Sequence, residues 1–249
     1  MTSESSVRAL AEQLSRGWLT GELIHCDVVI TSVAQAYATQ SEVAQRLGWF
    51  KDDRARVWKL GGSPGTGACA AAVPVDAVHE PGWPAAVNVL GFEAELAVRL
   101  GKDLPAGSTL AQAAAAVEAW LPCIEVCATR FAGGLADPLL QLADQQLNHA
   151  LVLGQPVTLV EAVDWTTLAV SVVIDGQQVL HQYGGHPWGN PLSALPWLAS
   201  HAARQADGLR AGDTIATGSW TGLHTVQPGA NVRVAFEGFG TAQVCIEQR

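Results

Sequence analysis

Two glutamates, Glu93 and Glu95, lie two residues apart within residues 91–100, a stretch that is otherwise mainly apolar. The apolar neighbours predict a strand that is at least partly buried, and residues two apart in a strand point to the same face. Two carboxylates side by side in an apolar setting repel each other and resist desolvation. They therefore require a counter-charge, which a divalent cation would supply. The same alternation also occurs on the solvated face of an edge strand, and the spacing alone leaves that interpretation open.

A third isolated acid, Glu125, lies in a short apolar run at residues 121–127 that also predicts a strand. Three carboxylates with no histidine nearby suit a hard, oxygen-seeking ion such as Mg²⁺ or Mn²⁺ better than Zn²⁺. Cys123 and Cys127 flank Glu125, and we interpret both as small buried hydrophobic residues.

The composition is that of a well-packed globular protein. Of the 249 residues, 49% are hydrophobic and 15% are charged, and the formal net charge is −9. This acidity, without any basic run, disfavours nucleic acid as a partner. No apolar segment reaches the ~20 residues needed to span a bilayer, and the polar N-terminus has no secretory pattern, so no membrane association is expected. Five cysteines without a paired motif favour reduced thiols and a cytoplasmic location.

The chain opens with two helical patterns. Apolar residues recur at helical spacing in two ranges, each followed by a glycine that can end a helix: 3–16 before Gly17, and 31–47 before Gly48. No flexible linker separates these patterns from the rest of the chain. We predict an N-terminal helical cap, residues 1–54, packed on a metal-binding, β-rich catalytic domain, residues 55–249.

Short strands dominate the predicted catalytic domain. Residues 57–60 predict a strand, and residues 61–67 predict a glycine-rich turn without the spacing of a phosphate-binding loop. Residues 68–90 hold several prolines and predict irregular structure. Later elements are a helix capped by Thr109 and Gln112 that runs to Trp120, a hairpin turning at Asp175–Gly176, a helix from Asn190–Pro191 to residue 206, and a final hairpin of residues 232–236 and 244–246.

These residues together resemble the fumarylacetoacetate hydrolase superfamily, on the side of the 2-keto-4-pentenoate hydratases. The matching segments follow in order over roughly residues 10–246, and they are 58–61, 91–97, 121–126 with Arg130, 144–154, 185–187, 190–192, 209–213 and 217–219. The glutamate pair alone would be weak evidence, whereas all these segments in order make a specific match. The resemblance implies an α+β fold, a mixed β-roll with an N-terminal helical region, and a homo-oligomer.

The resemblance also implies the site. Mg²⁺ or Mn²⁺ would be held by Glu93, Glu95 and Glu125 and would chelate the carboxylate and 2-oxo group of a small 2-oxo acid. Lys59 is the implied catalytic residue, whose ammonium pairs with the developing enolate or, if burial beside the cation lowers its pKa, acts as an acid or base. The implied substrate-binding residues are Gly61, Thr217 and Ser219. Residues 217–219 suit a plain strand-ending turn equally well.

The implied reaction is hydration of a 2-hydroxypenta-2,4-dienoate-like substrate through a metal-bound enolate. The same enolate serves decarboxylation of a 2-oxo diacid and hydrolysis of a C–C bond, and a catalytically silent, metabolite-binding relative is a further alternative. Departures from the family pattern motivate these alternatives: Ala128 replaces an aspartate, Gln145 an asparagine and Asn148 a small polar residue. Family hydrolases place a histidine and a glutamate on a lid helix, but His79 and Glu80 are adjacent and would not share a helix face.

Two more polar residues belong to the matching segments. We interpret His186 as a structural hydrogen-bonding residue rather than a ligand. Arg130 has two equally supported interpretations, as the partner of a site carboxylate or substrate and as one half of a structural salt bridge.

Overall fold

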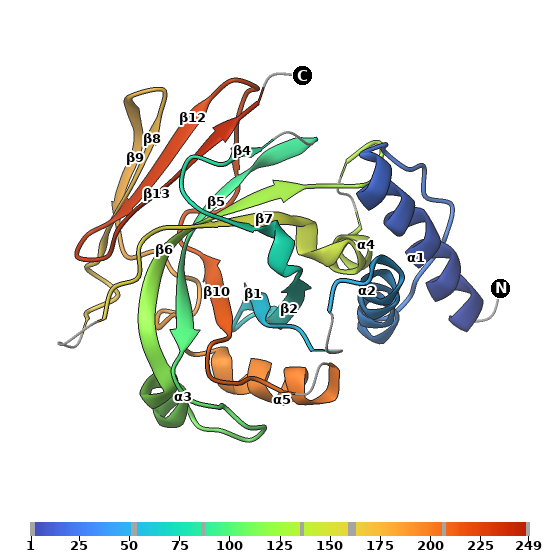
Figure 1. The fold of residues 1–249 in the computed structure, drawn as a ribbon, viewed down its shortest axis with the longest axis horizontal. Coiled ribbons are helices and arrows are strands. Elements are labelled where there is room, and N and C mark those ends of the chain that lie inside the picture. The colour runs from blue at the N-terminus through green and yellow to red at the C-terminus, as the bar shows by residue number, and fades with distance from the viewer. Residues whose placement is uncertain are drawn as a thin grey trace.

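The computed structural model describes residues 3–50, 54–85, 88–134, 137–158, 163–205 and 208–247. Two β-sheets carry helices along one side and at one end (Figure 1). The helices are α1 (Ser3–Thr20), α2 (Val33–Leu47), α3 (Leu110–Ala116), α4 (Pro138–Ala143) and α5 (Leu195–Gln205), with the 3-10 turns η1 (Val75–Ala77) and η2 (Gln145–Leu147). The strands are β1 (Val57–Ser63), β2 (Gly67–Val73), β3 (Val78–His79), β4 (Pro84–Ala85), β5 (Val89–Leu100), β6 (Val117–Ala128), β7 (Asn148–Leu153), β8 (Ala169–Ile174), β9 (Gln177–Tyr183), β10 (Thr214–Ser219), β11 (His224–Thr225), β12 (Asn231–Phe236) and β13 (Gly240–Ile246). In these ranges no helix is long and apolar enough to cross a membrane.

The larger sheet has eight strands and curls into a half-barrel (Figure 1). Its order is β2-β1-β10-β5-β6-β7-β3, and β11 pairs with the end of β5. β1 runs parallel to β10 and β3 parallel to β7, whereas the other neighbours are antiparallel. The two longest strands, β5 and β6, are paired over almost their full length and form the centre of the sheet.

The smaller sheet has five strands in the order β4-β13-β12-β8-β9. It packs on one face of the half-barrel, where Ile124 and Val126 of β6 share a buried cluster with Val234 and Val244. Because side chains alternate along a strand, the residues between these, such as Cys123 and Glu125, face the inside of the half-barrel. This arrangement of mixed sheets and helices is the expected α+β fold.

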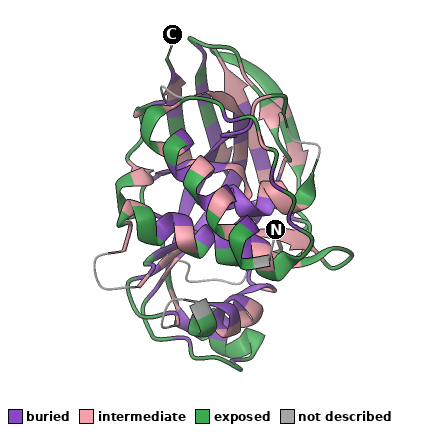
Figure 2. Cartoon of the chain, turned by 90° about the vertical axis from the view of Figure 1, so that its right-hand side faces the viewer, coloured by how far each residue is buried: buried purple, intermediate pink, exposed green. Residues whose placement is uncertain are grey.

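The helices α1 and α2 pack against each other and against α4. Their shared cluster of buried apolar residues includes Leu10, Leu14, Val43, Phe131 and Leu142. Figure 2 shows exposed residues on the outer surface of these helices and buried residues toward the strands. The helices therefore cover one side of the half-barrel, while the boundary between residues 54 and 55 stays a prediction.

The prediction that the first helix ends at Gly17 was wrong, because α1 continues to Thr20. A Cβ at position 17 would lie 3.0 Å from Cγ of Arg130. Glycine here permits close packing of the helix on that side chain rather than ending the helix. The following residue, Gly21, adopts a positive φ of 70°, which suits the exit from a helix.

The predicted end of α2 and the predicted start of α3 are confirmed, whereas the predicted end of α3 at Trp120 is wrong. Gly48 ends α2 in the left-handed conformation, and Thr109 with Gln112 forms the capping box of α3. The third helix stops at Ala116, however, and residues 117–128 form β6. Pairing of this segment with β5 on one side and β7 on the other overrides the helical pattern of its alanines.

The glycine-rich segment is mostly strand rather than turn. β1 continues through Gly61 and Gly62 to Ser63 and pairs with β2, so the turn shrinks to residues 64–66. Residues 68–90 were predicted to be irregular, but they include most of β2 and the short strands β3 and β4. Hydrogen bonds to neighbouring strands stabilise these segments as strands, although their residue propensities did not predict strands.

The hairpins are confirmed and the last helix is shorter than predicted. Asp175 and Gly176 both have positive φ in the turn between β8 and β9, as a type I′ turn requires. Asn190 starts a turn, in which its Oδ1 accepts a hydrogen bond from Leu192 N, and α5 begins only at Leu195. The predicted end of this helix at residue 206 lies outside the described residues.

Candidate active site

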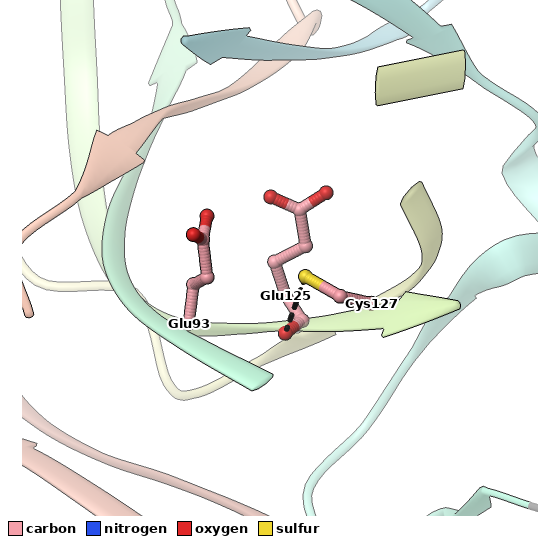
Figure 3. A group of neighbouring side chains, drawn as sticks. All are labelled: Glu93, Glu125 and Cys127. Atoms are coloured by element: carbon pink, nitrogen blue, oxygen red, sulfur yellow. Dashed lines mark hydrogen bonds between the residues drawn. The ribbon is translucent and has the colours of Figure 1, made fainter. Parts of the chain in front are cut away.

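The central strand pair brings acidic residues from distant parts of the sequence together. Glu93 of β5 lies directly opposite Glu125 of β6, and Glu95 lies opposite Cys123. Figure 3 shows the side chains of Glu93 and Glu125 rising from the two strands toward the same side. A ligand atom of each residue and Sγ of Cys127 all lie within 4.8 Å of one another. The edge-strand interpretation is therefore wrong, because β5 is a central strand.

Glu95 lies on the same face of β5 as Glu93 but outside that group of atoms. Its side chain is fully buried, and its Oε2 accepts a hydrogen bond of 3.0 Å from Gly218 N. Its Oε1 is buried without a hydrogen-bond partner. A buried carboxylate oxygen that lacks a partner is costly, so this atom is suited to binding a ligand.

Lys59 reaches this cluster from β1, two strands away from β5 across β10. Its Nζ lies 2.9 Å from Glu125 Oε2 and donates a hydrogen bond of 3.2 Å to Gln146 O. Burial disfavours the charged form of Lys59, but the carboxylates, Glu125 first, outweigh it and raise the pKa of Lys59. In the metal-free protein the ammonium is therefore a protonated counter-charge, and the alternative, in which burial beside the cation lowers the pKa of Lys59, stays a prediction.

Asn148, at the start of β7, completes the surroundings of Glu125. Its Nδ2 donates a hydrogen bond of 2.9 Å to Glu125 Oε1. Asn148 thus holds one oxygen of the fully buried Glu125 side chain, while Oε2 has the ion-pair contact with Lys59 but no hydrogen-bond partner. Sequence reasoning noticed Asn148 only as a departure from the family pattern and missed this contact.

The carboxylates are held in an environment that disfavours their charge. Burial and then the charge of Glu125 raise the pKa of Glu93 to about 7 and that of Glu95 well above its usual value. Three carboxylates, Glu93, Glu95 and Glu125, face the single ammonium of Lys59, which leaves two negative charges if all are ionised. A divalent cation would balance these charges, and the all-oxygen donor set fits a hard ion such as Mg²⁺ or Mn²⁺.

Cys127 lies beside the carboxylates of Glu93 and Glu125 and contributes Sγ to the same group of atoms. Burial raises the pKa of its thiol well above the usual value, and the charge of Glu125 adds to this effect. The thiol is directed to the backbone oxygen of Glu125, 3.9 Å away (Figure 3). Cys127 is 2% exposed, which agrees with the predicted small buried residue, and a hard ion prefers the carboxylate oxygens to its sulfur.

The predicted substrate-binding residues differ in their surroundings. Thr217 is committed to the backbone, because its Oγ1 donates a hydrogen bond of 2.7 Å to Leu96 O. Ser219 Oγ is buried without a hydrogen-bond partner and is free to bind a ligand. Gly61 lies beside the side chain of Gln146, whose Oε1 would be 3.3 Å from a Cβ at position 61.

The two other matching residues are structural. His186 Nε2 lies 3.1 Å from Thr217 O, which agrees with the predicted hydrogen-bonding role. Arg130 donates hydrogen bonds to Asp144 through its side chain and backbone N–H, so the interpretation as a structural salt bridge is the one the structure supports. Neither residue contacts the three carboxylates.

Comparison with known proteins places this geometry in a family. Residues 66–247 match the family model described as fumarylacetoacetate (FAA) hydrolase C-terminal. The chain therefore belongs to the fumarylacetoacetate hydrolase family.

Within that family, the similar curated proteins carry two different activities. The chain is 31% identical over 151 residues to a 4-oxalocrotonate decarboxylase of Pseudomonas putida, covering 60% of this chain and 57% of that protein. It is also 31% identical over 157 residues to a 2-keto-4-pentenoate hydratase of Paraburkholderia phymatum, covering 63% of this chain and 60% of that protein. The matched region thus spans less than two thirds of these relatives.

Solved structures share the fold over a longer span. The 4-oxalocrotonate decarboxylase from Pseudomonas putida G7, complexed with magnesium and adipate, has a TM-score of 0.84 at 25% identity and covers 99% of this chain and 98% of that one. A fumarylpyruvate hydrolase from Pseudomonas aeruginosa, in complex with Mn²⁺ and pyruvate, has a TM-score of 0.59 at 18% identity and covers 79% of this chain and 91% of that one. At this identity the match shows similarity of fold alone.

Proposed function

We propose that the protein is a divalent-metal-dependent lyase that acts on a small 2-oxo acid, by hydration of a 2-hydroxypenta-2,4-dienoate-like substrate. The observation that carries this proposal is the cluster of the half-buried Glu93 and the buried Glu125, with buried Glu95 on the same face, whose charge Lys59 compensates only in part. Perturbed carboxylates of this kind, gathered inside a curled sheet, are typical of a functional site. The activities named for the similar curated proteins agree with the proposal.

In this proposal Glu93, Glu95 and Glu125 hold Mg²⁺ or Mn²⁺, for which they provide oxygen donors. When bound, the ion supplies a Lewis acid that stabilises negative charge on the oxygen of a 2-oxo group. Lys59, whose Nζ lies 2.9 Å from Glu125 Oε2, offers a positive charge to the same developing enolate. Gly61 leaves room for the Gln146 side chain beside β1, and in this proposal the free hydroxyl of Ser219 binds a substrate oxygen.

The same site supports a second reaction, decarboxylation of a 2-oxo diacid. Similarity over nearly the whole chain to a 4-oxalocrotonate decarboxylase favours this alternative. The hydrolase alternative has less support, because His79 lies at the end of β3 and stacks on Trp83, with ring centroids 3.8 Å apart, rather than on a lid helix. Self-association and a cytoplasmic location stay predictions.

Thermal unfolding tests metal binding before any substrate is known. Mg²⁺ is expected to raise the Tm, and Mg²⁺ with oxalate or pyruvate to raise it further, because ligands that bind only the folded state stabilise it. Glu95→Gln should remove both effects while preserving side-chain shape. Glu118→Gln, an exposed residue of the same sheet, is the matched control and should retain them. Wild-type protein that gains no stability from either addition would contradict the proposal.

Ultraviolet assays then separate the reactions. With Mg²⁺ present, loss of dienol absorbance without release of carbon dioxide supports hydration, whereas release of carbon dioxide from a 2-oxo diacid supports decarboxylation. Metal binding without turnover of either substrate would favour the catalytically silent alternative.

A further inference from the structure

The segment between α4 and β7 has an uncommon backbone. Gln145, Gln146 and Leu147 all have positive φ, of 53°, 52° and 66°. Residues other than glycine adopt this conformation rarely, and each costs roughly 1–2 kcal/mol. Three in succession form a left-handed turn that the surrounding structure must hold in place, a feature concentrated at functional sites.

Arg130 holds both ends of this left-handed turn. Its Nη2 donates a hydrogen bond of 2.8 Å to Asp144 O, before the turn, and its Nη1 donates one of 3.1 Å to Asn148 O, after it. The Asp144 carboxylate also accepts a hydrogen bond of 2.9 Å from Arg130 N. Because Arg130 and Asp144 are buried, the turn is fixed from inside the protein.

The turn directs Gln146 at the candidate site. The backbone oxygen of Gln146 accepts the hydrogen bond from Lys59. Its side-chain Nε2 and Oε1 are both buried without a hydrogen-bond partner, beside Gly61. The Cys69 thiol lies nearby: burial raises its pKa, and the charge of Lys59 and an interaction with the Gln146 side chain oppose that rise. Neither carboxamide atom of Gln146, however, has a partner at hydrogen-bonding distance and angle.

Leaving both ends of a buried carboxamide without partners is costly, which points to a ligand as the missing partner. The group that binds there is expected to be uncharged. Of the nearby cations, Lys59 is already paired with Glu125 and Arg130 with Asp144, so neither is available for a second carboxylate of the substrate. A carboxamide, which both donates and accepts hydrogen bonds, matches a hydroxyl or carbonyl group.

We propose that Gln146 determines substrate specificity: its carboxamide binds an uncharged oxygen, a hydroxyl or carbonyl, on the carbon chain beyond the 2-oxo group. This inference rests on the proposed function and narrows its substrate class. It favours 4-hydroxy-2-oxo acids, the products of hydrating a dienol, over 2-oxo diacids.

Binding of three saturated ligands with Mg²⁺, measured by calorimetry, tests the proposal without turnover. They are 2-oxopentanoate, 4-hydroxy-2-oxopentanoate and 2-oxohexanedioate. The wild-type protein should bind the hydroxy acid about 3- to 10-fold more tightly than 2-oxopentanoate, as one neutral hydrogen bond predicts. It should bind 2-oxohexanedioate no more tightly than 2-oxopentanoate. Gln146→Met should bind both monoacids equally.

Two further variants separate a specific effect from damage to the turn. Gln145→Met alters the neighbouring residue, whose Nε2 donates a hydrogen bond to Gln40 O, and should retain the preference for the hydroxy acid. Gly61→Ala crowds the carboxamide and should weaken that preference. If Gln146→Met prefers the hydroxy acid over 2-oxopentanoate by the same factor as the wild type, the inference about Gln146 fails while the proposed function stands. If wild type binds none of the three ligands with Mg²⁺, the proposed function fails and the inference fails with it.

Discussion

At the residue scale, the ion pair of Lys59 and Glu125 compensates part of the negative charge of the metal-free site. The Glu125 side chain is fully buried and that of Lys59 is 7% exposed, with 2.9 Å between Nζ and Oε2. A buried pair of this kind adds little net stability compared with an apolar pair, but removing one partner leaves the other charge without compensation. The metal-free protein therefore relies on Lys59 to hold the carboxylates together.

Lys59→Met is expected to destabilise the metal-free protein by about 3–5 kcal/mol, because it leaves Glu125 buried without a counter-charge. The double variant Lys59→Met, Glu125→Gln should recover most of this loss, since it removes both charges. Urea unfolding in the presence of a chelator measures the free energies of unfolding. A double variant as unstable as the single one would show that Lys59 acts through packing rather than charge.

At the element scale, the predictable parts of the fold are those whose side-chain pattern is local. β5 and the paired strands of the two hairpins alternate apolar residues with a period of two, and their glycine turns lie between them. β6 was only half predicted, because residues 117–120 continue an alanine-rich helix and become a strand only through their partners. Tertiary pairing, which a local pattern does not contain, decides such segments.

The candidate site divides in the same way. The spacing of Glu93 and Glu95 predicted their common face, the position of Glu125 in an apolar run marked it as the third carboxylate, and the resemblance to a family selected Lys59 as catalytic. The contacts made by Gln146 and Asn148 were not predicted. They arise from a left-handed turn of residues without glycine, which no propensity indicates, and from hydrogen bonds that span 87 and 23 residues of sequence.

The turn that carries these contacts depends on Arg130. Arg130→Met should destabilise the protein by about 3–5 kcal/mol, because Asp144 is fully buried and loses its charged partner. It should also weaken Mg²⁺ binding, since Asn148 no longer holds Glu125 in place. Urea unfolding and calorimetry measure the two effects. Arg8→Met, which breaks an exposed ion pair with Glu4, is the matched control and should change stability by less than about 1 kcal/mol.

An Arg130→Met variant with wild-type stability would show that Asp144 is satisfied without the guanidinium. A variant that is destabilised but binds Mg²⁺ with unchanged affinity would show that the left-handed turn does not position Glu125 for metal binding.

At the scale of the whole molecule, the half-buried His149 and the buried His186 and His201 connect the helices and sheets. His149 stacks on Trp18 of α1, His186 bonds to the backbone of β10, and His201 of α5 packs against Tyr37 and Trp58. Burial lowers the pKa of each of these histidines to about 4. As the pH falls below 6.5 the unfolded chain takes up protons first, so the stability they support is lost between about pH 6.5 and 4.

The carboxylates of the candidate site act in the opposite direction. Because burial raises the pKa of Glu93 to about 7 and that of Glu95 well above its usual value, the metal-free folded protein binds protons that the unfolded chain does not. Their contribution to stability is present below the unfolded pKa of about 4.5 and is lost as the pH rises through 7. Mg²⁺ stabilises the ionised carboxylates and so removes this loss.

These opposed groups predict how metal and pH combine. The difference in Tm between protein with Mg²⁺ and protein with a chelator should be large at pH 8 and should shrink toward pH 5, where protons replace the metal on Glu93 and Glu95. With Mg²⁺ present, the Tm should still fall below pH 6.5, because the histidines remain. Scans from pH 4 to 8 measure both curves, and Glu95→Gln should bring them together. A metal-dependent difference that stays constant over this range would mean that the raised carboxylates do not bind the ion.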